Sequence, residues 1–548
     1  MSDLTRAGWS ISSSEPALNR LAENKGVGVF VVDLGVEDPL DFSLGSLELS
    51  TRKMTTNGSL EVSASVNRLG PASQRSIQLT VEKPDSSLPV VRDGKAMFPE
   101  KTWTVNRTID VRDNGTAKTK LEFQELLEPG VYHGKVEIVG SDPLAVNDQQ
   151  FFTFEVSEPW QALIVRPDGT DSSVIRKTIA PQSMVQTGTS SFEETTISQI
   201  ALSEIKSLEQ YHAIFLVDPE PMAEETWKML EDRVAGGGGL AIFLGNNAVG
   251  LNGLPDPTFL TPTATKLLTG KLTVQFHCPD RANEPFILSP RGFQHPVLAP
   301  FRKVTAGIPW QRNPVFTFWG IEPDDNEEDF PTATVISYSN FEPALIERQI
   351  GLGRILVMTT PVSEPNNLRN REQWNQLRPF DELAWASFVV FHGISRFIVN
   401  ADSDSLDIKV GQVASLRNDL KKFPDTWTIF SPDPEKPPAK IATVGGNLNY
   451  RFTDTPGHYR LKGILEGPVL RGFSANLNPA GVDLNRIEPA ELDKVLGSER
   501  YQLARQKDEI TRQQGTARKG REFYPLLMMM MFAAVVIEFL VSNRFYKS

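Results

Sequence analysis

The feature that most constrains this chain is an apolar stretch near its C-terminal end. Residues 523–541 read FYPLLMMMMFAAVVIEFLV, and Glu538 is their one charged side chain. As a helix these residues would extend roughly 28 Å, about the thickness of the hydrocarbon core of a bilayer. Aromatic side chains flank both ends, as they do at membrane interfaces: Phe523, Tyr524, Phe545 and Tyr546. The stretch therefore predicts one membrane-spanning helix; the alternative is a helix buried in a soluble core.

The side of the membrane on which the other residues lie stays open. Six lysines and arginines precede the stretch between Arg505 and Arg521, whereas Arg544 and Lys547 follow it. This imbalance favours a cytoplasmic location for the large N-terminal part. The first thirty residues lack a basic start followed by an apolar core, so they do not predict a signal peptide.

Charge and cysteine content exclude two classes of site. The formal net charge is −12, which gives no electrostatic support for binding nucleic acid. Cys278 is the one cysteine, so intrachain disulfides and cysteine-based metal clusters are excluded. With 548 residues, the chain is long enough for three or four domains.

Two regions alternate apolar and polar residues with a period of two, which is typical of strands with one buried face. The run LEVSASV at 60–66 is an example from residues 43–157, where Asn-Gly and Pro-Gly turn signals separate such runs. Residues 401–485 return to this period, and PGHY at 456–459 echoes PGVY at 129–132. We therefore expect a β-sandwich in each region.

Between them, residues 158–400 alternate apolar strands with helices. The segments AIFLV at 213–217 and ILVM at 355–358 are candidate buried strands, and residues 197–208 and 381–399 are candidate helices. This alternation predicts a parallel sheet covered on both faces. The expected fold class is thus multidomain, with a flavodoxin-like α/β domain flanked by two β-sandwiches and followed by a C-terminal transmembrane helix.

The remaining segments are short. Residues 1–42 predict one helix and a strand at 27–32, which cannot bury both of their faces alone, so they suggest the remnant of an α/β domain. Residues 486–522 are polar and helix-prone, and they predict a juxtamembrane helical connector to the span at 523–541.

Several stretches together resemble a bacterial family of large membrane proteins related to the aerotolerance protein BatA. They cover most of the chain in order: GVFVVDLG (28–35), SDPLAVNDQQFFTFEV (141–156), GGGGLAIFLGNN (236–247), PALIERQIGLGRILVMTTPV (343–362), GFSANLNPAGVDLNRIEPAELDKVLG (472–497) and GREFYPLL…EFLVSNRFY (520–546). The resemblance implies a von Willebrand A domain, a sandwich, a domain similar to class I glutamine amidotransferases, a second sandwich and a final membrane helix.

This chain departs from the family pattern at its N-terminal end. A pair of membrane helices and the metal-ion-dependent Asp-x-Ser-x-Ser signature are absent, so we expect an N-terminally shortened relative that holds no metal. The resemblance implies a location at the bacterial inner membrane and a partnership with MoxR-type ATPases. The family places its globular part in the periplasm, whereas the charge imbalance favours the cytoplasm, so the side remains open.

The turn after the short apolar run LAIFL at 240–244 decides whether the α/β domain can act as an amidotransferase. By the resemblance, a catalytic cysteine would stand on this strand-to-helix turn, where the sequence has Gly245, Asn246 and Asn247. Asparagine offers no thiolate, so these residues predict no nucleophile. We therefore expect no catalytic residues here and treat Gly245, Asn246 and Asn247 as a candidate ligand pocket.

Other reactive side chains do not form a recognisable catalytic set. Cys278 follows His277 directly, and adjacent side chains of an extended segment point to opposite faces, so the pair is not expected to bond. His295 precedes a proline and is expected to cap a turn, whereas His212 and His392 are expected to be structural. No HExxH, GxSxG or phosphate-loop motif occurs, and no cofactor is expected.

Three hypotheses of function remain. The first is a membrane-anchored, non-enzymatic scaffold whose inactive amidotransferase-like domain binds a protein partner or a small ligand. The second is a hydrolase or amidotransferase with an atypical site. The third is a protein that binds an envelope polymer such as a carbohydrate.

Overall fold

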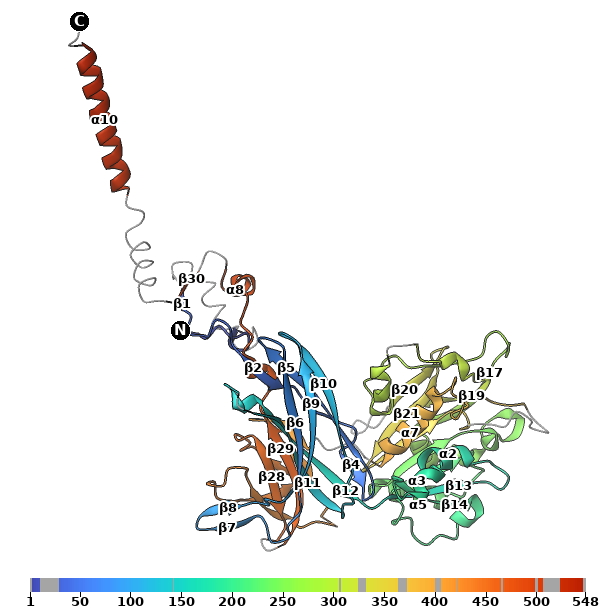
Figure 1. Ribbon diagram of the computed structural model, residues 1–548. Coiled ribbons are helices and arrows are strands. Elements are labelled where there is room, and N and C mark those ends of the chain that lie inside the picture. Colours follow the sequence, from blue (N-terminus) through green and yellow to red (C-terminus); the bar gives the residue numbers. More distant parts are fainter. Residues whose placement is uncertain are drawn as a thin grey trace.

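The computed structural model describes residues 2–9, 29–140, 142–304, 307–323, 332–362, 372–399, 406–420, 422–464, 467–497, 501–505 and 523–545. The described chain is rich in β-structure, contains several sheets and carries one long apolar helix, α10 (Tyr524–Phe545), near its C-terminal end. In Figure 1 the β-strands of two regions lie beside an α/β region, and α10 stands apart from all three. The helix predicted within residues 1–42 lies outside the described residues.

The first β region consists of two packed sheets. One has strand order β10-β5-β2, with β3 paired to β5, and the other has order β4-β12-β11-β6-β9. Leu60, Val62, Ala64 and Val66 of β5 are all buried, which confirms the alternation predicted for this run. The strands are β2 (Asp41–Leu44), β3 (Glu48–Leu49), β4 (Lys53–Thr55), β5 (Leu60–Leu69), β6 (Ser73–Glu82), β9 (Thr102–Val111), β10 (Thr116–Phe123), β11 (Gly130–Val139) and β12 (Gln149–Ser157), with a hairpin of β7 (Val90–Arg92) and β8 (Lys95–Met97).

The second β region is one seven-stranded sheet with order β23-β29-β28-β25-β26-β27-β24. Strand β26 pairs with β25 along most of its length and with β27 at its end, so the sheet bends around a single core. The strands are β23 (Asp407–Lys409), β24 (Ala414–Arg417), β25 (Thr426–Phe430), β26 (Ala439–Val444), β27 (Asn447–Tyr450), β28 (Gly457–Lys462) and β29 (Val469–Asn476).

The two β regions share the local structure that their echoed sequences predict. In each, a Pro-Gly step opens a strand, and a buried tyrosine follows two residues after the glycine. The Tyr132 hydroxyl donates to the carbonyl of Glu128, and the Tyr459 hydroxyl donates to the carbonyl of Thr455, both at 2.9 Å. These bonds tie the start of each strand to the preceding turn.

The α/β region is built on an eight-stranded sheet with order β14-β13-β15-β16-β22-β21-β20-β18. The helices α2 and α7 cover one face, and α5 and α6 cover the other. The strands are β13 (Trp160–Arg166), β14 (Phe192–Ser198), β15 (Ala213–Val217), β16 (Gly239–Phe243), β18 (Leu288–Ser289), β20 (Ala333–Tyr338), β21 (Pro343–Ile350) and β22 (Gly353–Met358), and a separate pair joins β17 (Gly270–His277) to β19 (Thr317–Pro323). The helices are α2 (Ser173–Ile179), α3 (Gln182–Gln186), α4 (Gln199–Leu202), α5 (Glu224–Ala235), α6 (Pro262–Leu267) and α7 (Ala386–Ile398).

Two predictions for this region need correction. The strands from β14 to β22 are parallel as expected, but β21, β20 and β18 pair antiparallel, because short turns join β20 to β21 and β21 to β22 while parallel strands need a crossover. The helix predicted over 197–208 is limited to α4, since residues 192–198 pair with β13 as the edge strand β14.

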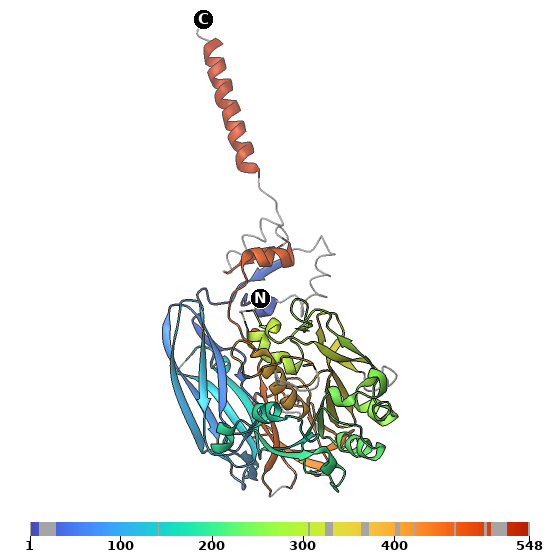
Figure 2. The ribbon, with the colours of Figure 1, turned by 90° about the vertical axis from the view of Figure 1, so that its right-hand side faces the viewer.

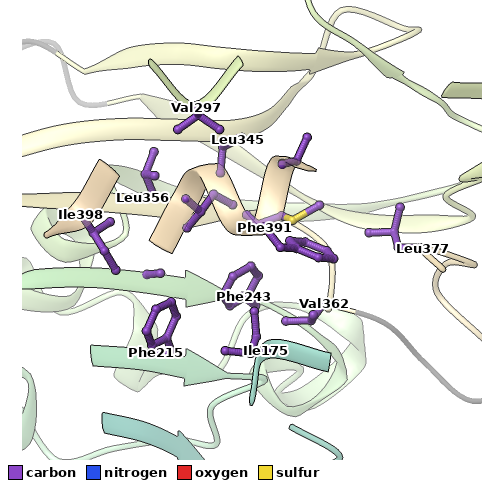
Figure 3. Close-up of a cluster of buried hydrophobic side chains, with 14 of the residues drawn as sticks. Ile175, Phe215, Phe243, Val297, Leu345, Leu356, Val362, Leu377, Phe391 and Ile398 are labelled. Atoms are coloured by element: carbon purple, nitrogen blue, oxygen red, sulfur yellow. The ribbon is translucent and has the colours of Figure 1, made fainter. Parts of the chain in front are cut away.

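A close-packed apolar core lies between α7 and the sheet. Figure 3 shows Phe391 of α7 beside Phe243 of β16, with Leu345 and Leu356 of the neighbouring strands above them. The rings of Phe243 and Phe391 meet edge to face, with centroids 5.9 Å apart. Because strands on both sides of β16 contribute to this core, it holds the carboxyl ends of the central strands in place.

Segments from opposite ends of the chain form a small unit between the β regions and α10, which Figure 2 shows clearly. Strand β1 (Val29–Val32) pairs in parallel with β30 (Tyr501–Ala504), and α8 (Pro489–Leu496) packs on them. The sequence predicted a helical connector over 486–522, but residues 501–504 are a strand, because the backbone of β1 offers them a ladder. The 3-10 turn η1 (Ala7–Trp9) lies in the same unit.

Asp33 ties this unit together. Its carboxylate accepts hydrogen bonds from Arg486 at 2.6 Å and from Arg505 at 2.7 Å, and it is only 5% exposed. Burial raises the pKa of Asp33, but the bonds from the two arginines outweigh this effect and hold the pKa below its usual value. Arg505 ends the described segment 501–505, which comes before α10 in the sequence.

Helix α10 has the length and composition of a membrane span. Twenty-one of its residues, Tyr524–Arg544, form a candidate membrane span by length and hydropathy, and none of them is buried against the rest of the described chain. At 1.5 Å per residue they extend about 30 Å. The apolar stretch that the sequence singled out is therefore a single helix that is long and apolar enough to cross a bilayer.

Candidate functional site

The candidate site lies at the carboxyl edge of the parallel strands, where loops from several strands meet. Asp218 follows β15, the Gly245–Asn247 turn follows β16, and Thr360 and Pro361 follow β22. Ligand sites of open α/β sheets are usually built at this edge, because neighbouring parallel strands end there together. The sequence placed the turn after β16 at such an edge, and the structure places it beside Asp218.

Asp218 and Asn247 hold the turn through two hydrogen bonds. The backbone N–H of Asn247 donates to Oδ1 of Asp218 at 2.9 Å, and the Asn247 side-chain amide donates to the carbonyl of Asp218 at 3.0 Å. Asp218 is 5% exposed and has a backbone φ of 47°, a conformation that residues other than glycine rarely adopt. We call this pair of bonds the Asp218–Asn247 bracket. It uses the amide of Asn247 to fix the backbone, so that amide is committed to the fold.

Gly245 packs too closely for any side chain. A Cβ at this position would lie 2.5 Å from Oδ1 of Asp218 and 2.9 Å from Cγ of Pro361. The carbonyl of Gly245 accepts a hydrogen bond from the indole N–H of Trp319 at 2.9 Å, and Trp319 is fully buried. The first residue of the turn is therefore enclosed by its neighbours, whereas Asn246 and Asn247 are both half-buried.

The turn does not lead into an α-helix, which corrects the expected strand-to-helix geometry. Residues Asn246–Ala248 form a 3-10 turn, and the next α-helix, α6, begins only at Pro262. Catalytic cysteines on such turns gain from the partial positive charge at a helix N-terminus. That source of stabilisation for an anion is missing from this turn, and neither Asn246 nor Asn247 carries a nucleophile.

The loop that follows the turn is compact and displays leucines. Val249 pairs with Pro255, and the backbone N–H of Gly250 donates to the carbonyl of Leu254 at 2.7 Å. At its tip Leu251 is 88% exposed, and Leu254 is 55% exposed. We call residues 246–256 the leucine loop. Its backbone bonds fix the loop, while its largest apolar side chains remain in solvent.

Cys278 and His277 do not form a catalytic pair. The Cys278 thiol is buried and donates to the carbonyl of Glu284 at 3.0 Å. Nδ1 of His277 lies 3.3 Å from the hydroxyl of Thr317 instead. The prediction that the two adjacent side chains do not bond is therefore confirmed, and the thiol is held away from the turn after β16.

The other histidines of this region have the structural roles expected of them. Nδ1 of His295 accepts the backbone N–H of Val297 at 3.2 Å and so caps a 3-10 turn, and its Nε2 lies 3.0 Å from Glu347. Nδ1 of His212 accepts the backbone N–H of Gln161 at 3.1 Å. Burial lowers the pKa of His212, which suits a neutral acceptor.

Sequence reasoning missed Asp218, Trp319 and Pro361, although all three shape the turn. They lie on other strands or loops, and only the fold brings them to Gly245. Asp218 follows a buried strand of five apolar residues, and a polar residue in that place is a signal that could have identified it. No group of three or more His, Cys, Asp or Glu side chains within the described ranges is arranged to hold a metal ion.

Two larger hollows of the α/β region lie away from this edge. One of about 590 Å³ is lined by α5 and the loop around Leu208, and another of about 590 Å³ lies between α2, α3 and the edge strand β14. Neither is lined by the residues of the turn or the leucine loop.

Comparisons with known proteins give no family for this chain. No family model matches it, and no curated protein matches it either. Among solved structures with some likeness, the cytoplasmic protein STM1381 from Salmonella typhimurium LT2 has 12% identity and a TM-score of 0.31, with 43% of this chain and 99% of that chain covered. A ThuA-like protein from Bacteroides uniformis has 15% identity and a TM-score of 0.28, with 45% and 94% covered. A ThuA-like protein from Parabacteroides merdae has 12% identity and a TM-score of 0.29, with 44% and 91% covered. Values this low assign neither a family nor an activity to the chain.

Proposed function

We propose that this protein is a membrane-anchored, non-enzymatic scaffold whose amidotransferase-like α/β region binds a protein partner. The observation that carries this proposal is the Asp218–Asn247 bracket. In this bracket the side-chain amide of Asn247 donates to the carbonyl of Asp218, at the position where an amidotransferase would present its nucleophile. A turn locked in this way lacks the group that covalent catalysis needs, but it keeps a fixed shape for binding.

The leucine loop supplies the binding surface in this proposal. Leu251 and Leu254 project from a loop whose backbone is already ordered, so a partner would not have to restrain it. Asn246 lies at the base of the loop and offers an amide for hydrogen bonding. The partner would therefore present an apolar groove for the leucines, with polar groups at its rim.

Helix α10 serves as the anchor in this proposal. A single membrane span of this length holds a protein at a bilayer without a second anchor, such as an attached lipid or a polybasic patch. Arginines introduced at Val535 and Val536, near the middle of the helix, would each cost roughly 2.5–3.5 kcal/mol of insertion. Extraction with alkaline carbonate should then release the double variant, whereas the wild-type chain should stay in the membrane pellet.

The resemblance of the sequence to BatA-like proteins suggests a bacterial inner-membrane assembly, with a MoxR-type ATPase as a possible partner. This suggestion rests on analogy and extends the proposal to a named class of protein. Direct binding of a purified ATPase of that class to the full chain, measured in detergent micelles, would test it separately from the scaffold function.

A photo-reactive amino acid at Leu251, introduced in native membranes, tests the scaffold function itself. We expect a discrete cross-linked protein that disappears when Leu254 is replaced by aspartate. Val444 is 70% exposed on the second β region and is a matched control position for the same probe. Cross-linking at Leu251 no stronger than at Val444 would refute the proposal, as would loss of an assayable amidohydrolase activity in a Cys278→Ser variant.

A further inference from the structure

The two β regions meet face to face, and a buried chain of four polar side chains joins them. Strands β11 and β12 of the first region pack on β28 and β29 of the second. Nδ1 of His133 lies 3.0 Å from the Thr153 hydroxyl, which lies 2.7 Å from the Ser474 hydroxyl, and this in turn lies 3.0 Å from Nδ1 of His458. Each region contributes one histidine and one hydroxyl, and all four side chains are buried.

The number of protons on the four side chains decides whether every proton of the hydrogen-bond chain has an acceptor. Its three links need three protons, and the two hydroxyls supply two of them. When Nδ1 of one imidazole donates the third and Nδ1 of the other accepts, each of the three protons has an acceptor. An imidazolium carries a proton on both nitrogens and cannot accept. If both rings were imidazolium, four protons would face three links: a hydroxyl oxygen can accept twice, but one hydroxyl proton would then have no acceptor within the hydrogen-bond chain.

The side chains packed around the two imidazole rings leave the rings no room to turn when a proton of the hydrogen-bond chain has no acceptor. The two imidazole centroids are 4.9 Å apart, and the ring of Phe151 meets His458 edge-on at 5.1 Å. A Cβ on Gly472 would lie 2.5 Å from Cε1 of His133, so the imidazole occupies the space that a side chain there would need. Nε2 of His133 is buried and has no hydrogen-bond partner among the described residues.

The charges on the surrounding strands do not compensate for added protons. Arg460 of β28 lies beside the pair, and its guanidinium is held by both oxygens of Glu82. Asp407 of β23 is paired with Arg52 and accepts the backbone N–H of Thr153. The other charged groups on the packed strands are Lys135 and Glu137 of β11, Glu155 of β12, Lys462 of β28 and Arg471 of β29. Burial lowers the pKa of both histidines well below its usual value, and Arg460 lowers it further.

We propose that this interface is an acid-sensitive joint, in which protonation of both His133 and His458 separates the first β region from the second. Two positive rings in contact would repel each other, leave one buried hydroxyl proton of the hydrogen-bond chain without an acceptor and meet carboxylates that are already paired. The first region is joined to β1 through residues 33–40, and the second leads on from β29 to α8, so separation would part the two faces while both regions stay attached to the unit that β1, β30 and α8 form. This inference does not depend on the proposed scaffold function.

Hydrogen–deuterium exchange on the full chain in detergent micelles tests the joint. Exchange is measured at pH 7.5 and pH 5.0 and corrected for the intrinsic pH dependence of amide exchange. Free histidine has a pKa of about 6.5, so each ring can contribute up to about a thirtyfold loss of protection at pH 5.0. We expect the protection of β11, β12, β28 and β29 to fall at least about tenfold, while β15 and β16 of the α/β region keep theirs.

Glutamine variants identify the groups responsible. Glutamine can donate and accept hydrogen bonds but does not titrate, so His133→Gln and His458→Gln should each reduce the loss at pH 5.0, and the double variant should abolish it. His212→Gln is the control, because Nδ1 of His212 also accepts a hydrogen bond but lies in the α/β region, away from the joint. An unchanged loss in the double variant would overturn the proposal. If that variant fails to fold, the wild-type chain decides, since equal losses in β11 and β15, or none in either, would overturn it as well.

Discussion

Substituting Gly245 by alanine tests whether the Asp218–Asn247 bracket is what holds the candidate site. The added methyl group would lie 2.5 Å from Oδ1 of Asp218 and 2.9 Å from Cγ of Pro361, so the carboxyl group would have to move. Its hydrogen bond from the backbone of Asn247 would then be lost, at a cost of about 1 kcal/mol. Overpacking adds about 1–3 kcal/mol, so we expect the turn to lose roughly 2–4 kcal/mol of local stability.

Two neighbouring substitutions make this prediction quantitative. Asn247→Ala removes only the bond from the side-chain amide to the carbonyl of Asp218 and should cost about 1 kcal/mol. Asn246→Ala changes a half-buried side chain for which the described structure gives no hydrogen bond, and it should cost less than about 0.5 kcal/mol. The expected order of destabilisation is therefore Gly245→Ala, then Asn247→Ala, then Asn246→Ala.

Amide exchange of peptides that cover residues 240–250 measures these effects locally, without assuming that the whole chain unfolds in one step. A loss of 3 kcal/mol corresponds to exchange about a hundredfold faster. Peptides from β5 in the first β region serve as an internal control and should not change. If Gly245→Ala speeds exchange no more than Asn246→Ala does, the bracket is not what makes the turn rigid, and the main support for the scaffold proposal is removed.

Three further predictions follow from single contacts. Asp33→Ala removes the acceptor of Arg505 and should make tryptic cleavage near that arginine about tenfold faster. Because the pKa of Asp33 is lowered, the stability that its carboxylate contributes is complete above about pH 4 and is lost only as the pH falls through the lowered pKa. Cleavage of the wild-type chain should therefore not change between pH 7 and pH 5 beyond the change in the activity of trypsin itself. Gly472→Ala places a methyl group 2.5 Å from His133 and should destabilise β29 by about 1–3 kcal/mol, measured by amide exchange; an unchanged rate would show that the imidazole has room to move. Cys278 is buried and bonded to a carbonyl, so iodoacetamide should alkylate it at least about tenfold more slowly than free cysteine, and rapid alkylation would revive the enzyme hypothesis.

Local patterns in the sequence determined the kinds of element that form. The apolar stretch after Phe523 could become little other than a long exposed helix, and the alternation at 60–66 could bury one face only as a strand. Such signals depend on neighbours within a few residues, so they survive without knowledge of the fold.

Tertiary structure decided everything that joins distant residues. Strand β30 exists because β1 pairs with it, although its own sequence favours a helix. The residue that locks Asn247 is Asp218 on another strand, and His133 meets His458 only because two separate sheets pack together. No local pattern encodes these pairings, since each depends on where the backbone of a second segment lies. The sequence therefore determined which elements this protein builds and that its turn lacks a nucleophile, while the packing of those elements decided that the turn is rigid and that the β regions share a joint.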